Sequence, residues 1–129
     1  MNILIDTHVF LWALLEPERL SDAAVAVLQS SANTLFFSAA SSWEIAIKWS
    51  KGGIILPKPP QDFVIGRLIE TGTRLLPISV NESLNVADLP FHHKDPFDRL
   101  LIAQAKSNGL RLFSGDPVFN KYDVDVFWI

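Results

Sequence analysis

The chain has 129 residues, of which 49% are hydrophobic, a formal net charge of −3 and no cysteine. This length fits one folded domain, residues 1–129, and the apolar fraction excludes a disordered chain. The absence of cysteine excludes disulfides and thiolate metal sites within this sequence, and it suits a reducing compartment. A protein that only coats nucleic acid would be basic, so the acidic balance counts against that class.

No secretion signal or membrane segment is predicted. Asp6 and His8 interrupt the first apolar run, which therefore lacks the long apolar stretch of a signal peptide. No window reaches the ~18 uninterrupted apolar residues that a membrane helix requires. We therefore expect a cytoplasmic protein with no membrane partner.

Short apolar strands and helices alternate along the first half of the chain. Apolar, β-branched runs predict strands, and helical spacing with capping residues predicts helices. The expected elements are a strand over 2–5, a helix over 8–15, a helix from Ser21 to 29, a strand over 34–39, and a helix over 42–50 opened by Ser41.

The second half continues the same alternation. The expected elements are a helix over 61–70, a strand over 74–78, a short helix from Asn81 or Ser83, a helix over 97–108, a strand over 110–113 and a last strand over 124–128. Such alternation predicts a mostly parallel sheet covered on both faces, which is a three-layer α/β/α sandwich. Sites in such sheets form beyond the carboxyl ends of the strands.

Two aspartates follow predicted strands directly. Asp6 ends the first strand, and Asp116 follows the strand over 110–113. Each has a simpler explanation as a helix N-cap, strongest for Asp116 because Pro117 follows it. Both carboxylates are nevertheless expected at the edge of the sheet where functional sites form.

Glu44 and Asp98 are acids with largely apolar neighbours. Ser41 and Glu44 match a capping box, in which the glutamate bonds back to the cap. A carboxylate among apolar residues is otherwise paired or bound, and both interpretations of Glu44 stay open. Asp98 shares a helical stripe with Leu101 and Ile102, so it is expected to face the sheet rather than water.

Four carboxylates at one edge would repel each other and raise each other's pKa values unless a cation neutralised them. Oxygen ligands favour hard ions such as Mg²⁺ or Mn²⁺ over zinc. Such ions, singly or as a pair, assist phosphoryl displacement, so a phosphodiester is the expected substrate class. The predicted ligands and catalytic residues are Asp6, Glu44, Asp98 and Asp116.

Histidines, tryptophans and basic residues elsewhere in the sequence are further candidates for the site and its surroundings. His92 and His93 precede Asp95. Two interpretations are open: the histidines are extra ligands or proton donors, or they belong to a polar, flexible loop. The pattern favours the loop. The tryptophans are expected mostly in the core, with some lining a groove for a partner helix; they are Trp12, Trp43, Trp49 and Trp128. Scattered basic residues are expected on the solvated surface, namely Lys48, Lys51, Lys58, Arg67, Lys94 and Arg99.

Four segments resemble the PIN-domain ribonucleases, most closely the VapC-type toxins of bacterial toxin–antitoxin pairs. They are LIDTHVFLWAL, SSWEIAIK, DPFDRLLIAQA and LFSGD, and together they cover nearly the whole chain in the family's order. The resemblance implies a Mg²⁺- or Mn²⁺-dependent endoribonuclease, frequently a homodimer, that a cognate antitoxin inhibits. It assigns the family's four acids to Asp6, Glu44, Asp98 and Asp116, and gives Ser114 the place of a small polar neighbour.

The segment DPFDRLLIAQA contains two aspartates that could bind a metal ion, Asp95 and Asp98. Asp95 precedes Pro96 and is expected in the loop. Asp98 is therefore the predicted ligand of the pair, and Asp95 is expected to assist without binding the metal directly.

A catalytically silent module that binds other proteins, or a nuclease acting on DNA, would have the same fold. The sequence does not distinguish these alternatives from a ribonuclease toxin.

Overall fold

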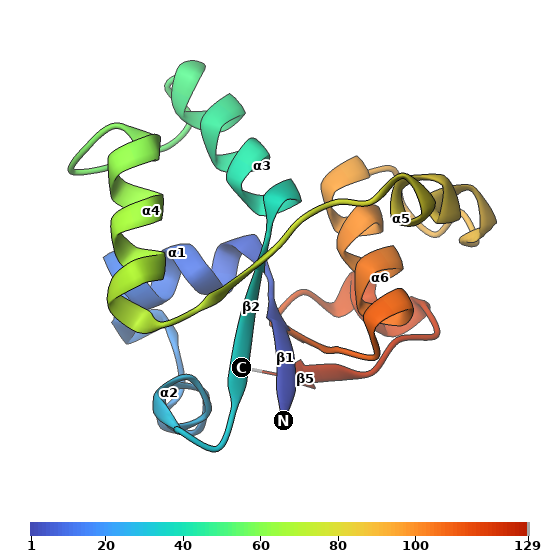
Figure 1. Ribbon diagram of the computed structural model, residues 1–129, viewed down its shortest axis with the longest axis horizontal. Helices are drawn as coiled ribbons and strands as arrows, with labels where there is room; N and C mark the ends of the chain where they lie inside the picture. Colours follow the sequence, from blue (N-terminus) through green and yellow to red (C-terminus); the bar gives the residue numbers. More distant parts are fainter. Residues whose placement is uncertain (129) are drawn as a thin grey trace.

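The computed structural model describes residues 1–128 and contains a parallel sheet with the strand order β3-β2-β1-β4-β5 (Figure 1). All four strand pairings are parallel. The strands are β1 (Asn2–Ile5), β2 (Thr34–Ser38), β3 (Arg74–Leu76), β4 (Arg111–Ser114) and β5 (Val126–Trp128). Because neighbouring parallel strands run in one direction, the carboxyl ends of β1, β2 and β4 lie at one edge of the sheet.

Helices connect the strands. The α-helices are α1 (Thr7–Leu15), α2 (Asp22–Gln29), α3 (Ala39–Ser50), α4 (Pro60–Thr71), α5 (Val80–Asn85) and α6 (Pro96–Asn108). Short 3₁₀ turns complete the fold as η1 (Pro17–Arg19), η2 (Val86–Asp88) and η3 (Pro117–Lys121). Gly72 and Gly109 end α4 and α6 with positive φ angles of 66° and 63°, which glycine adopts without steric cost.

Two hydrophobic cores lie on opposite faces of the sheet. Ile3 and Ile5 pack with side chains of α1, α2 and α4, whereas Leu4 between them packs with side chains of α6, as the alternation of strand side chains requires. Figure 1 shows α1, α2 and α4 on one side of the sheet and α5 and α6 on the other. The predicted α/β/α sandwich is therefore confirmed.

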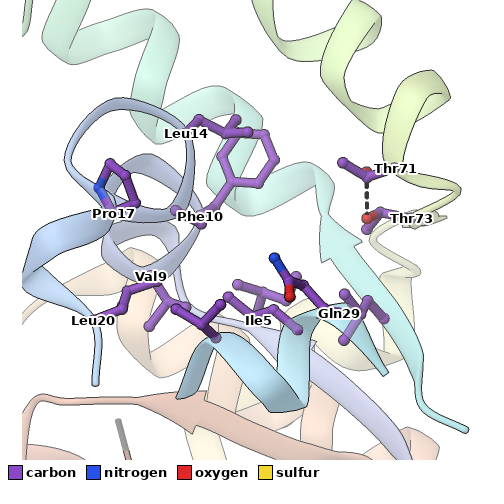
Figure 2. Close-up of a pocket in the computed structure, with 13 residues that line it drawn as sticks. Ile5, Val9, Phe10, Leu14, Pro17, Leu20, Gln29, Thr71 and Thr73 are labelled. Atoms are coloured by element: carbon purple, nitrogen blue, oxygen red, sulfur yellow. Dashed lines mark hydrogen bonds between the residues drawn. The ribbon is translucent and has the colours of Figure 1, made fainter. Parts of the chain in front are cut away.

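An apolar pocket lies on the face of the sheet that α1 and α2 cover. A mostly apolar cavity of about 270 Å³ lies between α1, α2 and the sheet, with Phe10 and Leu14 of α1 in its lining (Figure 2). Thr71 and Thr73 lie at the far side of this space.

The start of α3 differs from the prediction. Ser38, not Ser41, is the N-cap, and its Oγ accepts a hydrogen bond from the Ala40 N–H at 2.9 Å. Ser41 is fully buried and its Oγ accepts a hydrogen bond from Thr7 Oγ1 at 2.8 Å. The predicted capping box between Ser41 and Glu44 is therefore wrong, because Ser41 is already inside the helix.

The start of α5 also differs from the prediction. Ser79, rather than Asn81 or Ser83, caps this helix and forms a reciprocal capping box with Glu82. The remaining predicted boundaries differ from the structure by a residue or two at most. Within residues 1–128, no helix is long and apolar enough to cross a membrane.

Candidate functional site

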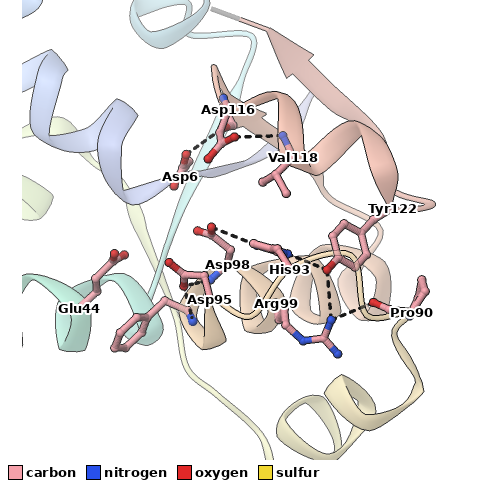
Figure 3. A network of polar contacts seen from close by, with 12 residues as sticks. Asp6, Glu44, Pro90, His93, Asp95, Asp98, Arg99, Asp116, Val118 and Tyr122 are labelled. Atoms are coloured by element: carbon pink, nitrogen blue, oxygen red, sulfur yellow. Dashed lines mark hydrogen bonds and ion pairs between the residues drawn. The ribbon is translucent and has the colours of Figure 1, made fainter.

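The four predicted acids come from segments that meet at the carboxyl edge of the sheet. Asp6 directly follows β1, and Asp116 lies two residues after β4. Glu44 lies on α3, which begins where β2 ends, and Asp98 lies in the first turn of α6. Figure 3 shows these side chains around one region of the molecule. This is the edge at which parallel α/β proteins form their sites.

Asp6 is the most deeply buried of these acids, with 2% of its surface exposed. Its Oδ2 accepts a hydrogen bond from Ser114 Oγ at 2.7 Å, whereas its buried Oδ1 has no hydrogen-bond partner among residues 1–128. Burial raises the pKa of Asp6, against the opposing effect of the Ser114 hydrogen bond. Asp6 occupies the N-cap position of α1, but its side chain makes no capping hydrogen bond, so capping does not explain the residue.

Asp98 shares its electrostatic surroundings with the other acids. Its side chain is 13% exposed. Burial raises the pKa of Asp98 to about 8, with further contributions from the negative charges of Asp95, Asp6, Glu44 and Asp116. Like charges close together oppose ionisation. The structure therefore brings Asp6, Glu44, Asp116 and Asp95 close enough to Asp98 for their charges to act on it.

Asp95 has a structural role at the same place. It is the N-cap of α6, and its Oδ1 accepts hydrogen bonds from the N–H groups of Phe97 at 2.9 Å and Asp98 at 3.0 Å. These contacts fix the first turn of α6 and therefore the direction in which Asp98 leaves the helix. Which of the two acids binds a metal ion stays a prediction.

Glu44 is 3% exposed and forms an ion pair with Lys48 at 2.8 Å. The pair spans one turn of α3, and the Lys48 side chain is partly exposed. Of the two interpretations left open by the sequence, the buried and paired carboxylate is the one observed. The ion pair holds the Glu44 carboxylate in place without a capping contact.

Asp116 is more exposed than the other three acids, and it does act as a cap. Its Oδ1 accepts a hydrogen bond from the Val118 N–H at 3.0 Å at the start of η3. Its own N–H donates to Ser114 Oγ at 3.1 Å. Ser114, which is fully buried, thus links Asp6 and Asp116. The small polar residue named by the sequence resemblance lies between two of the acids.

The acids do not form a closed ligand cage. Within residues 1–128, no three Asp, Glu or His side chains lie close enough together to hold a metal ion as they stand. The donor set nevertheless fits a hard divalent cation, because its oxygens are carboxylate oxygens and Asp6 Oδ1 is buried without a partner. Mutual repulsion keeps such carboxylates apart until a positive charge joins them.

His92 and His93 lie in the polar loop before α6, as the sequence favours, and both side chains make contacts there. Both imidazole rings pack edge-on against Tyr122. His93 also contacts Asp98, with 3.3 Å between Nε2 and Oδ2. Tyr122 lies 29 residues beyond His93, and no local pattern in the sequence signals this contact.

The burial of Arg99 differs from the prediction, and that of two tryptophans decides between the places expected for them. Arg99 was expected in solvent but is only 4% exposed, and its guanidinium donates to the Pro90 carbonyl oxygen at 2.9 Å. Of the two places expected for the tryptophans, the core is excluded for Trp43 and Trp49, because both are exposed, Trp43 by 58%. Trp12 is half-buried and packs against the core. The side chain of Trp128 lies outside the described residues.

Fold and site together define a parallel α/β protein with an acidic centre at the carboxyl edge of its sheet. A family model of the PIN domain matches residues 3–125. The chain belongs to the PIN domain family. The resemblance seen in the four sequence segments is thereby confirmed.

Individual proteins match this chain over only part of its length or at low sequence identity. The chain is 38% identical over 58 residues to "Ribonuclease VapC16" of Mycobacterium tuberculosis, a match that covers 45% of this chain and 40% of that protein. One chain in the crystal structure of VapBC2 from Rickettsia felis, bound to a DNA fragment from the VapBC2 promoter, is similar with a TM-score of 0.76 and 14% identity. The match covers 100% of this chain and 99% of that chain. A chain of FitAcB from Neisseria gonorrhoeae has a TM-score of 0.62 and 20% identity, with coverage of 97% and 96%. At these identities, the solved structures establish the fold alone.

Proposed function

We propose that this chain is a metal-dependent endoribonuclease that hydrolyses RNA phosphodiester bonds and acts as the toxin of a type II toxin–antitoxin pair. The observation that carries the proposal is the burial of Asp98 beside the charges of Asp6, Glu44 and Asp116. Membership of the PIN domain family and the match to a ribonuclease support it. Strongly perturbed carboxylates in one cluster are typical of functional sites.

In this proposal, Asp6, Glu44, Asp98 and Asp116 hold Mg²⁺ or Mn²⁺. All-oxygen ligation favours these hard ions. When bound, such an ion lowers the pKa of a water molecule and stabilises negative charge on a phosphate undergoing displacement.

The surrounding residues orient the four acids. Ser114 donates to Asp6 Oδ2 and leaves Oδ1 for a cation. Asp95 fixes the first turn of α6, and Lys48 holds the Glu44 carboxylate at the site. A ligand that is held in place loses less conformational freedom when an ion binds, so these contacts favour metal binding.

Two lysines beside the acids are suited to bind the substrate backbone. Lys48 lies one helical turn from Glu44 with a partly exposed side chain, and Lys94 is exposed next to Asp95. Lysine side chains neutralise phosphates, and binding that depends on them weakens as the salt concentration rises. Lys48 and Lys94 are therefore the proposed contacts of the RNA backbone at the site.

The proposed partner is an amphipathic segment of an antitoxin. An apolar groove of about 600 Å³ lies beside α3, lined by Ser42 and Ala46 of α3, Ile65 and Leu68 of α4, and Leu75 of β3. Ile65 and Leu75 are exposed hydrophobic residues, and such a groove can take the apolar face of a helix. A basic antitoxin side chain that reaches the carboxylates would neutralise them and exclude the metal. The homodimer implied by the resemblance remains part of this proposal.

The test is cleavage and stability measured on the same purified chain. Labelled single-stranded RNA and DNA of matched sequence are incubated with Mn²⁺, with Mg²⁺ and with a chelator. We expect metal-dependent cleavage of RNA, and at ~100 Kd of Mn²⁺ an increase of about 2.7 kcal/mol in the unfolding free energy. Cleavage of DNA alone would support a DNA-directed nuclease. No cleavage and no metal-induced stabilisation would support a silent binding module.

A further inference from the structure

Asp98 has a hydrogen-bonding partner outside the group of acids. His93, in the loop before α6, lies with Nε2 3.3 Å from Asp98 Oδ2 and Nδ1 2.7 Å from the hydroxyl oxygen of Tyr122. The Tyr122 hydroxyl accepts a hydrogen bond from Arg99 Nη1 at 3.1 Å. Figure 3 shows the resulting chain of contacts from Arg99 through Tyr122 and His93 to Asp98.

The chemistry of these groups sets the direction of each hydrogen bond. A guanidinium can only donate, so the Tyr122 oxygen accepts from Arg99. The single hydroxyl hydrogen of Tyr122 then needs an acceptor, and within residues 1–128 the one in contact is His93 Nδ1. A neutral imidazole that accepts at Nδ1 carries its hydrogen on Nε2. His93 therefore donates to Asp98 Oδ2.

Arg99 and Tyr122, at the end of this series of contacts away from Asp98, are held in place by several further contacts. Arg99 and Tyr122 are both buried. The guanidinium also donates to the carbonyl oxygens of Pro90 at 2.9 Å and Val86 at 3.2 Å. Its carbon lies 4.2 Å from the centre of the Phe91 ring, at a distance typical of a cation–π contact. These contacts leave His93 little freedom to turn away from Asp98.

We propose that His93 is a positioning residue that holds the Asp98 carboxylate for metal binding, in the Nε2–H tautomer that Tyr122 and Arg99 impose. Its hydrogen bond engages Oδ2, and among residues 1–128 no hydrogen bond engages Oδ1, which is left for the cation. Because both ring nitrogens are occupied by Asp98 and Tyr122, His93 acts through Asp98 rather than as a ligand. This inference rests on the proposed function, since it assigns a metal to Asp98.

The first test measures the Mn²⁺ dissociation constant by electron paramagnetic resonance of free Mn²⁺. Removal of an orienting partner typically costs ~10–100-fold in metal affinity, which is the loss expected for His93→Ala. His93→Gln should stay close to wild type, because the glutamine amide N–H replaces the Nε2–H donor. His92→Gln is the matched control, since His92 packs on Tyr122 but makes no hydrogen bond to Asp98, and it should bind like wild type.

The second test reads the tautomer directly and needs no metal. Long-range ¹H–¹⁵N NMR spectra near neutral pH, with and without Mg²⁺, should show the His93 ring, assigned by its absence in His93→Gln, as the neutral Nε2–H tautomer. In Tyr122→Phe, which lacks the hydroxyl donor, this preference should weaken. An Nδ1–H tautomer in the wild-type protein would overturn the inference even if a variant failed to fold.

The outcomes separate the two proposals. Wild-type protein that binds no Mn²⁺ would overturn the proposed function and the role of His93 with it. Wild-type binding together with undiminished binding by His93→Ala would overturn the role of His93 alone. Equal losses in His93→Gln and His93→Ala would show that the Nε2–H donor is not what matters, and would also overturn it.

Discussion

The burial of Asp6 lowers the unfolding free energy of the metal-free protein. Its carboxylate is buried and one of its oxygens has no hydrogen-bond partner among residues 1–128. A buried polar atom without a partner typically costs about 1–3 kcal/mol, and more when it is charged. A residue selected only to stabilise the fold would be apolar or fully paired at this position. Asp6 therefore fits a role in binding a cation.

Asp6→Asn should abolish RNA cleavage and leave the fold intact. Asparagine keeps the shape of the side chain and can still accept the Ser114 hydrogen bond, but it lacks the ligand charge. Cleavage assays in Mn²⁺ and thermal unfolding of the same sample measure both effects. Asp123→Asn, the same change at an exposed acid outside the site, is the control. A folded Asp6→Asn protein with full activity would refute the ligand assignment.

Asp98→Asn should weaken Mn²⁺ binding more than Asp95→Asn. Asp98 lacks a capping role, whereas Asp95 Oδ1 is engaged by two N–H groups of α6. Asparagine is also a good N-cap, so Asp95→Asn should keep the helix start. Loss of a residue that acts from outside the ligand set typically costs ~10–100-fold, and loss of a direct ligand should cost more. Paired Mn²⁺ titrations decide the question, and a larger loss in Asp95→Asn would reverse the assignment.

At the scale of elements, local signals predicted most of the fold, and contacts distant in sequence account for the errors. The helices predicted over 61–70 and 97–108 end within a residue of the predicted positions, because the left-handed glycines that follow them, Gly72 and Gly109, are a local requirement. Ser41 matched a capping box, but its partner is Thr7, 34 residues away. In the site, the strand ends placed Asp6 and Asp116, whereas the link between His93 and Tyr122 depends on the tertiary fold.

The cap of α5 offers a direct test of these assignments. Ser79→Ala removes the Oγ that accepts from the Glu82 N–H at 3.1 Å, so it should lower the unfolding free energy by about 1 kcal/mol. Ser83→Ala is the matched control, because Ser83 is exposed and its hydroxyl only donates to the Val80 carbonyl oxygen within the helix. Urea denaturation of the two variants and wild type measures the difference. A larger loss in Ser83→Ala would favour the start predicted from sequence.

At the scale of the whole molecule, the acidic centre couples stability to pH and to metal. The Asp98 carboxyl has a pKa of about 8 in the fold, against an ordinary value of 3.8. Between these two values the folded protein binds more protons than the unfolded chain, so its unfolding free energy falls as the pH rises. A cation bound to the ionised carboxylates acts in the opposite direction, because it favours the charged folded state.

The metal-free protein should therefore be less stable near about pH 8 than near about pH 5, because over this range the Asp98 carboxyl keeps its proton in the folded state but has lost it in the unfolded chain. Denaturation in a chelator at constant ionic strength measures this slope. Saturating Mg²⁺ should reduce it, because metal binding stabilises the ionised acids. Asp98→Asn should flatten the metal-free slope, whereas the control Asp123→Asn should retain it. A wild-type profile in chelator that is flat, or that rises with pH, would show that burial does not raise the pKa of Asp98 in the fold.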